Sequence, residues 1–211
     1  MKQKYIVMII LVLLGLVGYK VFFYTPKKYQ NVDFRISDYH SGKDQDDDGI
    51  DDQSDILINS KIYIEKNPKY KSKYYRGGYS DDEYGVCTDV VAYALLHAGY
   101  DLRELVNADI ISHQDAYGID IVDKDIDFRR VQNLEKFFRK HAMSLTLDAH
   151  DIAQWQGGDI VVFENHIGIV SDHRNRKGIN YVIHHNGPLQ LHYEQDILAK
   201  RKDIIGHYRM Q

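Results

Sequence analysis

The chain contains little cysteine and proline and has no excess of basic charge. Its 211 residues include one cysteine and three prolines, with 27 Lys and Arg against 31 Asp and Glu. A single cysteine excludes internal disulfides, and the weakly negative charge excludes the electrostatic footprint of a nucleic-acid-binding domain. Seventeen tyrosines against three prolines favour a structured, strand-containing fold over a linker. The length predicts about one domain with its own core.

A long hydrophobic run occurs at the N-terminus. Residues 1–30 place Lys2 and Lys4 before an apolar stretch from Ile6 to Gly18, which extends with one interruption to Tyr24. The longer stretch approaches the ~20 residues that span a bilayer. We expect an uncleaved signal anchor, because no small-residue cleavage site follows the run; a cleaved signal peptide is the alternative. Both place the rest of the chain outside the cytoplasm, with the membrane as a partner in the first case.

An acidic loop follows, with the spacing of a calcium-binding loop. Residues 44–55 read DQDDDGIDDQSD, with Gly49 at the sixth position, where a sharp turn is needed. Ca²⁺ takes six to eight oxygen ligands, and alternate residues of such a loop direct their carboxylates inward. The predicted ligands are Asp44, Asp46, Asp48, the carbonyl of Ile50, Asp52 and Asp55. The loop resembles those of thrombospondin type 3 repeats and dockerins. The alternative is a solvated acidic linker.

The remaining residues change from a helical to a strand-like hydrophobic period. The predicted helices are Ser54–Asn67, Thr88–Ala98, Asp101–Ile111 and Arg129–His141. The predicted strands are Ser144–Leu147, Asp159–Phe163, His166–Ser171, Tyr181–His185 and Ile204–Arg209. Helices followed by an antiparallel sheet form an α+β fold. We therefore expect a domain over residues 54–211, preceded by a linker over 31–53.

Cys87 stands directly before the clearest predicted helix. A thiol at a helix N-terminus is close to the positive end of the helix dipole, which favours the nucleophilic thiolate. A small buried hydrophobic side chain is the alternative role for this residue. The predicted position at a helix start in an exported chain favours the nucleophile.

Two histidines in neighbouring predicted strands are candidates for the base and its orienting partner. His166 opens one strand, and Gly168 leaves the sheet face beside its ring open. His184 lies in the next strand, where alternation places it on the opposite face from His185. A cysteine nucleophile needs such a base, held in place by a third group. Closely spaced pairs of zinc ligands are absent from the sequence, so we expect no cofactor in catalysis.

Seven motifs in order carry a family resemblance. They are Tyr-x-Gly-Gly at 75–78, Gly-Val-Cys-Thr-Asp-Val-Val at 85–91, Asp-x-Arg-Arg-Val-x-Asn-Leu at 127–134, Trp-x-x-Gly-Asp-Ile-Val at 155–161, His-Ile-Gly-Ile-Val-Ser-Asp at 166–172, Ile-His at 183–184 and Gly-His-Tyr-Arg at 206–209. This set of motifs resembles that of the bacterial domain-of-unknown-function family 1287 over roughly residues 54–209. The order of cysteine, Gly-Asp and the two histidines resembles the NlpC-type, papain-like cell-wall cysteine peptidases.

The broader resemblance implies a fold and a reaction. The fold would be papain-like, with N-terminal helices that carry Cys87 packed on an antiparallel sheet that carries the histidines. The reaction would be hydrolysis of amide bonds in peptidoglycan stem peptides, with Cys87 as nucleophile, His166 as base and His184 as orienting residue. Val86 and Thr88 around the cysteine depart from the usual Asp-Cys-Ser-Gly of the NlpC group. The alternatives are a non-catalytic, calcium-stabilised binding module of the cell envelope and a thiol-dependent acyltransferase.

Overall fold

The computed structural model describes residues 4–5, 8, 12 and 26–211. Most of the predicted signal anchor therefore lies outside the described residues. Among the residues that are described, no helix combines the length and the apolar character needed to cross a bilayer.

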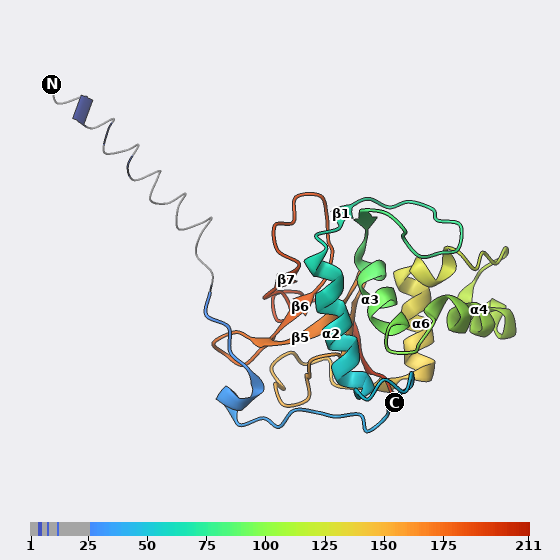
Figure 1. The fold of residues 1–211 in the computed structure, drawn as a ribbon, viewed down its shortest axis with the longest axis horizontal. Coiled ribbons are helices and arrows are strands. Elements are labelled where there is room, and N and C mark those ends of the chain that lie inside the picture. The colour runs from blue at the N-terminus through green and yellow to red at the C-terminus, as the bar shows by residue number, and fades with distance from the viewer. Residues whose placement is uncertain (1–3, 6–7, 9–11, 13–25) are drawn as a thin grey trace.

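The chain forms its helices first and most of its strands afterwards (Figure 1). The helices are η1 (Asn31–Phe34), α2 (Asp52–Glu65), α3 (Cys87–Leu96), α4 (Leu102–Ser112), α5 (Gln114–Tyr117), η2 (Asp127–Arg129) and α6 (Val131–His141). The strands are β1 (Lys69–Tyr70), β2 (Tyr84–Gly85), β3 (Met143–Ser144), β4 (Ile160–Phe163), β5 (His166–Arg174), β6 (Asn180–Ile183), β7 (Glu194–Gln195) and β8 (Ile204–Arg209). The predicted α+β class is confirmed.

Six of the strands form one antiparallel sheet in the order β3-β8-β4-β5-β6-β7. A two-residue turn joins β4 to β5 and sets His166 opposite Phe163. β5 is the longest strand of the sheet and lies at its centre. The two remaining strands, β1 and β2, pair in parallel just before α3.

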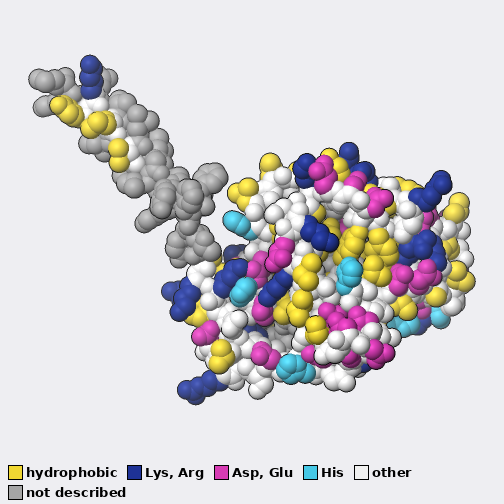
Figure 2. Space-filling view, viewed as in Figure 1, with side chains coloured by type: hydrophobic (Ala, Val, Ile, Leu, Met, Phe, Trp, Pro, Cys, Tyr) yellow, Lys and Arg dark blue, Asp and Glu magenta, His cyan; other side chains and the backbone are white. Residues whose placement is uncertain are grey.

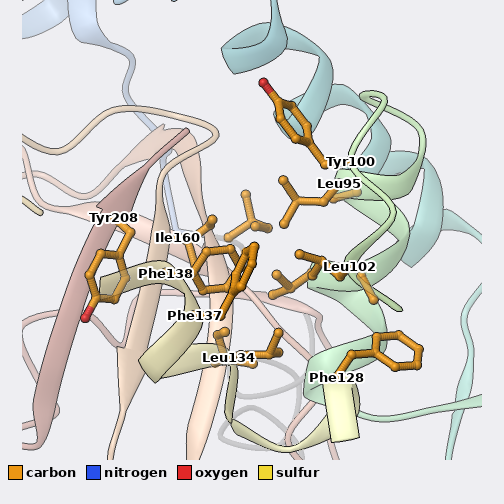
Figure 3. Close-up of a cluster of buried hydrophobic side chains, with 14 of the residues drawn as sticks. Leu95, Tyr100, Leu102, Phe128, Leu134, Phe137, Phe138, Ile160 and Tyr208 are labelled. Carbon is orange, nitrogen blue, oxygen red and sulfur yellow. The ribbon is translucent and has the colours of Figure 1, made fainter. Parts of the chain in front are cut away.

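The main core lies between the helices and one face of this sheet. Figure 3 shows aromatic and aliphatic side chains of α3, α4 and α6 meeting Ile160 of β4 and Tyr208 of β8. A second, smaller core covers the opposite face, where Val161, Phe163 and Val182 pack around Trp155. Both faces of the central strands are therefore buried, which explains their nearly continuous hydrophobic sequence.

Residues before the predicted domain also pack on the sheet. Tyr29 pairs with Arg174 at the end of β5 through two backbone hydrogen bonds of 2.9 and 2.7 Å. The guanidinium of Arg174 is fully buried and donates to the side-chain oxygen of Asn31 at 2.6 Å. Tyr39 lies under the guanidinium of Arg209, 4.1 Å from ring centroid to Cζ. The segment predicted as a linker is thus held against the domain at several points.

Candidate functional site

The two predicted catalytic histidines contact each other directly. His166 is the first residue of β5, and His184 directly follows β6, the neighbouring strand. The Nε2 atom of His166 lies 2.8 Å from Nδ1 of His184, and both residues are buried. Gly168 makes room for this contact, because a Cβ on Gly168 would lie 3.1 Å from Cβ of His184 and 2.7 Å from the Ile183 carbonyl oxygen. The predicted pairing of these imidazoles is present in the structure.

A glutamine on β7 completes the hydrogen-bonded chain. The Oε1 atom of Gln195 lies 3.0 Å from Nε2 of His184. A carbonyl oxygen only accepts, so His184 donates from Nε2, and its Nδ1 accepts from Nε2 of a neutral His166. This leaves Nδ1 of His166 without a proton, and within the described residues that atom makes no hydrogen bond. The chain of three side chains therefore holds His166 in the tautomer that a base requires.

Cys87 lies at the same end of the sheet. It is the first residue of α3, one position further into the helix than predicted, and is partly exposed. The N–H of Val170 donates toward β4. Because N–H groups alternate sides along a strand, the N–H of Ile167 points to the β6 side of β5. β6 has already ended at this level, so it does not pair with Ile167. The Ile167 N–H helps to lower the pKa of the Cys87 thiol, so the sulfur lies near the start of β5. The described residues show no hydrogen bond between the thiol and either imidazole.

Burial controls the protonation states of these groups. It raises the pKa of the Cys87 thiol to about 11, although the Ile167 N–H acts in the opposite direction. Burial also lowers the pKa of His166 to about 3, with a further contribution from His184, whose own pKa burial lowers to about 4. The expectation of a resting thiolate is wrong for this structure, because burial outweighs the helix dipole. The resting site holds a neutral thiol beside neutral imidazoles.

An arginine outside the predicted site acts on the two imidazoles. The Arg201 guanidinium lies 4.3 Å from the ring centroid of Phe163 and donates to Asp203 at 2.8 Å. Its charge helps to lower the pKa of His166, while the hydrogen bond to Asp203 raises the pKa of Arg201 itself. Sequence reasoning missed Arg201 because it lies in the loop before β8, distant from the other residues in the sequence.

A buried ion pair fixes the start of the cysteine helix. Asp89 accepts two hydrogen bonds from Arg129, at 2.8 and 2.9 Å, and both side chains are almost fully buried. The same carboxylate accepts from the N–H of Val86 at 2.8 Å, as expected of an acidic residue at a helix start. Arg129 is therefore a structural residue and not part of a solvated helix face, whereas Arg130 is exposed.

A second buried cluster joins two of the motifs. Asp159 accepts from Arg209 at 2.7 and 2.8 Å and from Nε2 of His207 at 2.9 Å. Gln53 of α2 donates to the same carboxylate at 2.9 Å. The indole of Trp155 stacks on His207 with ring centroids 3.6 Å apart. The Gly-Asp and Gly-His-Tyr-Arg motifs thus contact each other and support the strand that leads to His166.

The acidic loop brings three of its predicted ligands together. The carboxylates of Asp44, Asp46 and Asp48 lie within 4.8 Å of one another. The Asp52 carboxylate has other partners: it accepts hydrogen bonds from the N–H of Gln45 at 2.8 Å and from the hydroxyl of Tyr100.

Asp55 is buried at the start of α2, and its Oδ2 atom has no hydrogen-bond partner. Burial, with Asp48 and Asp46 as neighbouring charges, raises the pKa of Asp55 to about 6. The predicted carbonyl ligand, Ile50, lies in the same exposed turn, where its N–H donates to Asp48 at 2.8 Å.

Comparison with known proteins identifies the family of this chain. The model of a family described as "Domain of unknown function (DUF1287)" matches residues 58–210. The chain belongs to the DUF1287 family. A curated relative, "Uncharacterized protein YijF" from Escherichia coli (strain K12), is 36% identical over 161 residues, which cover 72% of this chain and 76% of the relative. No solved structure matches the chain.

The DUF1287 match covers both histidines, Cys87 and Gln195, and begins after the acidic loop. The predicted site and its two supporting clusters, apart from Gln53, therefore lie within the matched residues. The loop over residues 44–55 lies outside the match.

Proposed function

We propose that this protein is a thiol hydrolase that cleaves amide bonds outside the cytoplasm, with peptidoglycan stem peptides as its substrates. The observation that carries the proposal is the buried chain from His166 through His184 to Gln195, at the end of the sheet where Cys87 opens α3. An imidazole oriented by a second group, beside a thiol at a helix start, is the arrangement that nucleophilic cysteine catalysis needs. The resemblance to NlpC-type, papain-like peptidases supports the substrate class.

Acylation begins from the neutral thiol and imidazole. As the Cys87 sulfur attacks the carbonyl carbon of the amide, its proton passes to Nδ1 of His166. The imidazolium that forms keeps its Nε2 proton, which it donates to His184. The C–N bond then breaks, the leaving amine takes the proton from Nδ1, and a thioester remains on Cys87.

Deacylation uses the same base on water. Nδ1 of His166 accepts a proton as the water oxygen attacks the thioester carbon. The C–S bond breaks, the product leaves as an acid, and the sulfur regains the proton. The N–H groups at the start of α3 are available to stabilise the negative oxygen of both tetrahedral intermediates.

Digestion of purified muropeptides, followed by mass spectrometry, tests the proposal. Cys87→Ala and His166→Ala should each lower the rate by about a thousandfold or more, because each removes a group that takes part in the reaction. His150→Ala is the matched control, since His150 is exposed and lies outside the site. Wild-type protein that releases no product from any muropeptide, or a Cys87→Ala variant with full activity, would refute the hydrolase.

The variant Gln195→Ala tests whether the hydrogen-bonded chain orients the base, His166. Loss of the Gln195 acceptor frees the tautomer of His184, so we expect kcat to fall by about tenfold or more while KM changes little. Gln195→Glu keeps an acceptor and should retain more activity than the alanine variant. Equal losses in both variants would show that the chain does not orient the base.

The two alternative functions give different results in the same assay. An acyltransferase would release the same amine but incorporate an added amine in place of water. A non-catalytic envelope module would bind muropeptides without releasing product, a role that the raised pKa of Cys87 favours.

A further inference from the structure

We propose that the loop over residues 44–55 binds one Ca²⁺ through Asp44, Asp46, Asp48, Asp55 and the carbonyl of Ile50. Acidic side chains gather at this edge of the molecule, near the start of α2 (Figure 2). The first three carboxylates lie within 4.8 Å of one another, close enough to share one cation. Within residues 26–211, no lysine or arginine forms an ion pair with any of these four aspartates.

Asp55 supplies the independent observation. Only 4% of its surface is exposed, and its Oδ2 atom has no partner among the described residues. Its other oxygen accepts from Asn59 at 2.7 Å. Asp48 and Asp46 are the charges that act most strongly on this buried carboxyl, so it lies near the group of three carboxylates, next to which the loop continues into α2. Leaving a carboxylate buried without a partner is costly, and a cation between these groups removes that cost.

The turn between the ligands already has a shape that suits a cation. Asp44 accepts from the N–H groups of Asp48 and Gly49, at 3.1 and 2.8 Å, which folds the loop back on its first residue. Gly49 has a φ of 93°, a conformation that favours glycine. The predicted ligand Asp52 is not in the proposed set, because its oxygens accept from Gln45 and Tyr100.

The ligand set favours Ca²⁺ over Mg²⁺. Four carboxylates and a carbonyl, completed by water, give the six to eight oxygens that Ca²⁺ takes in flexible geometry. Mg²⁺ keeps several of its waters and demands near-ideal octahedral geometry. For a single extracellular loop of this type we expect a Kd on the order of 10⁻⁴–10⁻³ M.

The cation would fasten the loop to two helices. The loop leads directly into α2, and it also reaches the end of α3, where a Cβ on Gly99 would lie 3.1 Å from the N atom of Asp46. Cys87 lies at the other end of α3, about 15 Å away for a helix of ten residues. The proposed role is therefore structural and does not depend on the proposed hydrolysis.

Thermal unfolding of the full-length protein in mild detergent, after treatment with EGTA, tests this proposal. Ca²⁺ at a few millimolar should raise Tm by several degrees, and Mg²⁺ should not. Asp46→Asn and Asp55→Asn should each weaken Ca²⁺ binding about tenfold or more, measured by calorimetry. Asp46 is exposed, so its substitution tests the site without disturbing the core.

Asp47→Asn is the matched control. It removes the same charge from the same loop, but Asp47 is exposed and outside the ligand set. Its φ of 60° is one that asparagine tolerates. We expect this variant to keep the Ca²⁺-dependent rise in Tm. No Ca²⁺ effect on the wild type, or an equal loss in Asp47→Asn and Asp46→Asn, would overturn the site in favour of a diffuse acidic cluster.

Discussion

At the scale of single residues, the site combines a neutral thiol with neutral imidazoles. The helix dipole at Cys87 is worth about 1 kcal/mol in a typical exposed position. Burial acts in the opposite direction and is the larger effect, because the thiolate loses most of its hydration. In the proposed mechanism, the thiolate would therefore form only as His166 takes the proton.

Alkylation of Cys87 by iodoacetamide tests this protonation state. The thiolate is the reactive form, so with a pKa of about 11 the rate should increase about tenfold per pH unit from about pH 7 to about pH 10. Mass spectrometry of the labelled protein gives the rate, and a small free thiol gives the reference. A rate that is already constant below about pH 8 would contradict the structure and indicate an ion pair with His166.

The sequence indicates which residues make up the candidate site, but not their electrostatics. Cys87, His166 and His184 are recognisable from local patterns, because a helix start and alternating strands fix where side chains point. Gln195 belongs to a two-residue strand with no hydrophobic pattern, so nothing in the sequence predicted its contact with His184. The pKa of a thiol depends on what packs around it, and that is decided by the tertiary structure.

At the scale of elements, α3 is held by its first turn. The pair between Asp89 and Arg129 attaches the N-terminal end of α3, which carries Cys87, to η2. Such a pair does not itself guarantee stability, since both charges lost their hydration when they were buried. Substitution of only one of the two residues, however, leaves the charge of the other buried without a partner.

Arg129→Ala should therefore destabilise the protein by about 3–5 kcal/mol, because it leaves Asp89 buried and unpaired. Urea unfolding at neutral pH measures the loss. Arg176→Ala is the control and should change stability by less than about 0.5 kcal/mol, because Arg176 is exposed. Similar losses in the two variants would show that the buried pair does not anchor α3.

The elements themselves were largely predictable. Each of the four predicted helices overlaps a helix of the structure, with ends shifted by at most two residues. The strands β4, β5, β6 and β8 follow their hydrophobic patterns, but β3 is shorter and begins one residue earlier than expected. Tyr29 and Asn31 were assigned to a linker or the anchor because their partner, Arg174, is distant in sequence.

At the scale of the whole molecule, buried histidines link stability to pH. Burial lowers the pKa of His166 to about 3 and those of His184 and His185 to about 4, from an ordinary value of 6.5. Between these values the unfolded chain binds protons that the folded chain does not. The stability that these residues provide is therefore fully present above about pH 6.5 and is lost as the pH falls toward 4.

Urea unfolding midpoints measured from about pH 7.5 down to about pH 4.5 test this linkage. Each histidine should contribute up to about 1.4 kcal/mol per pH unit to the loss. His185→Asn should flatten the dependence, and His150→Asn, at an exposed position, should leave it unchanged. Stability that is constant from pH 7 to pH 5 would contradict neutral burial of the three rings.

The pairing of Tyr29 with Arg174 also fixes where the N-terminal segment joins the domain relative to the candidate site. Arg174 is the last residue of β5 and His166 the first, so the two ends of this strand lie roughly 26 Å apart. For a protein held by its first residues, the point of attachment is at one end of the strand and the imidazole pair is at the other. In a protein attached in this way, the candidate site would lie on the side of the domain away from the surface that holds it.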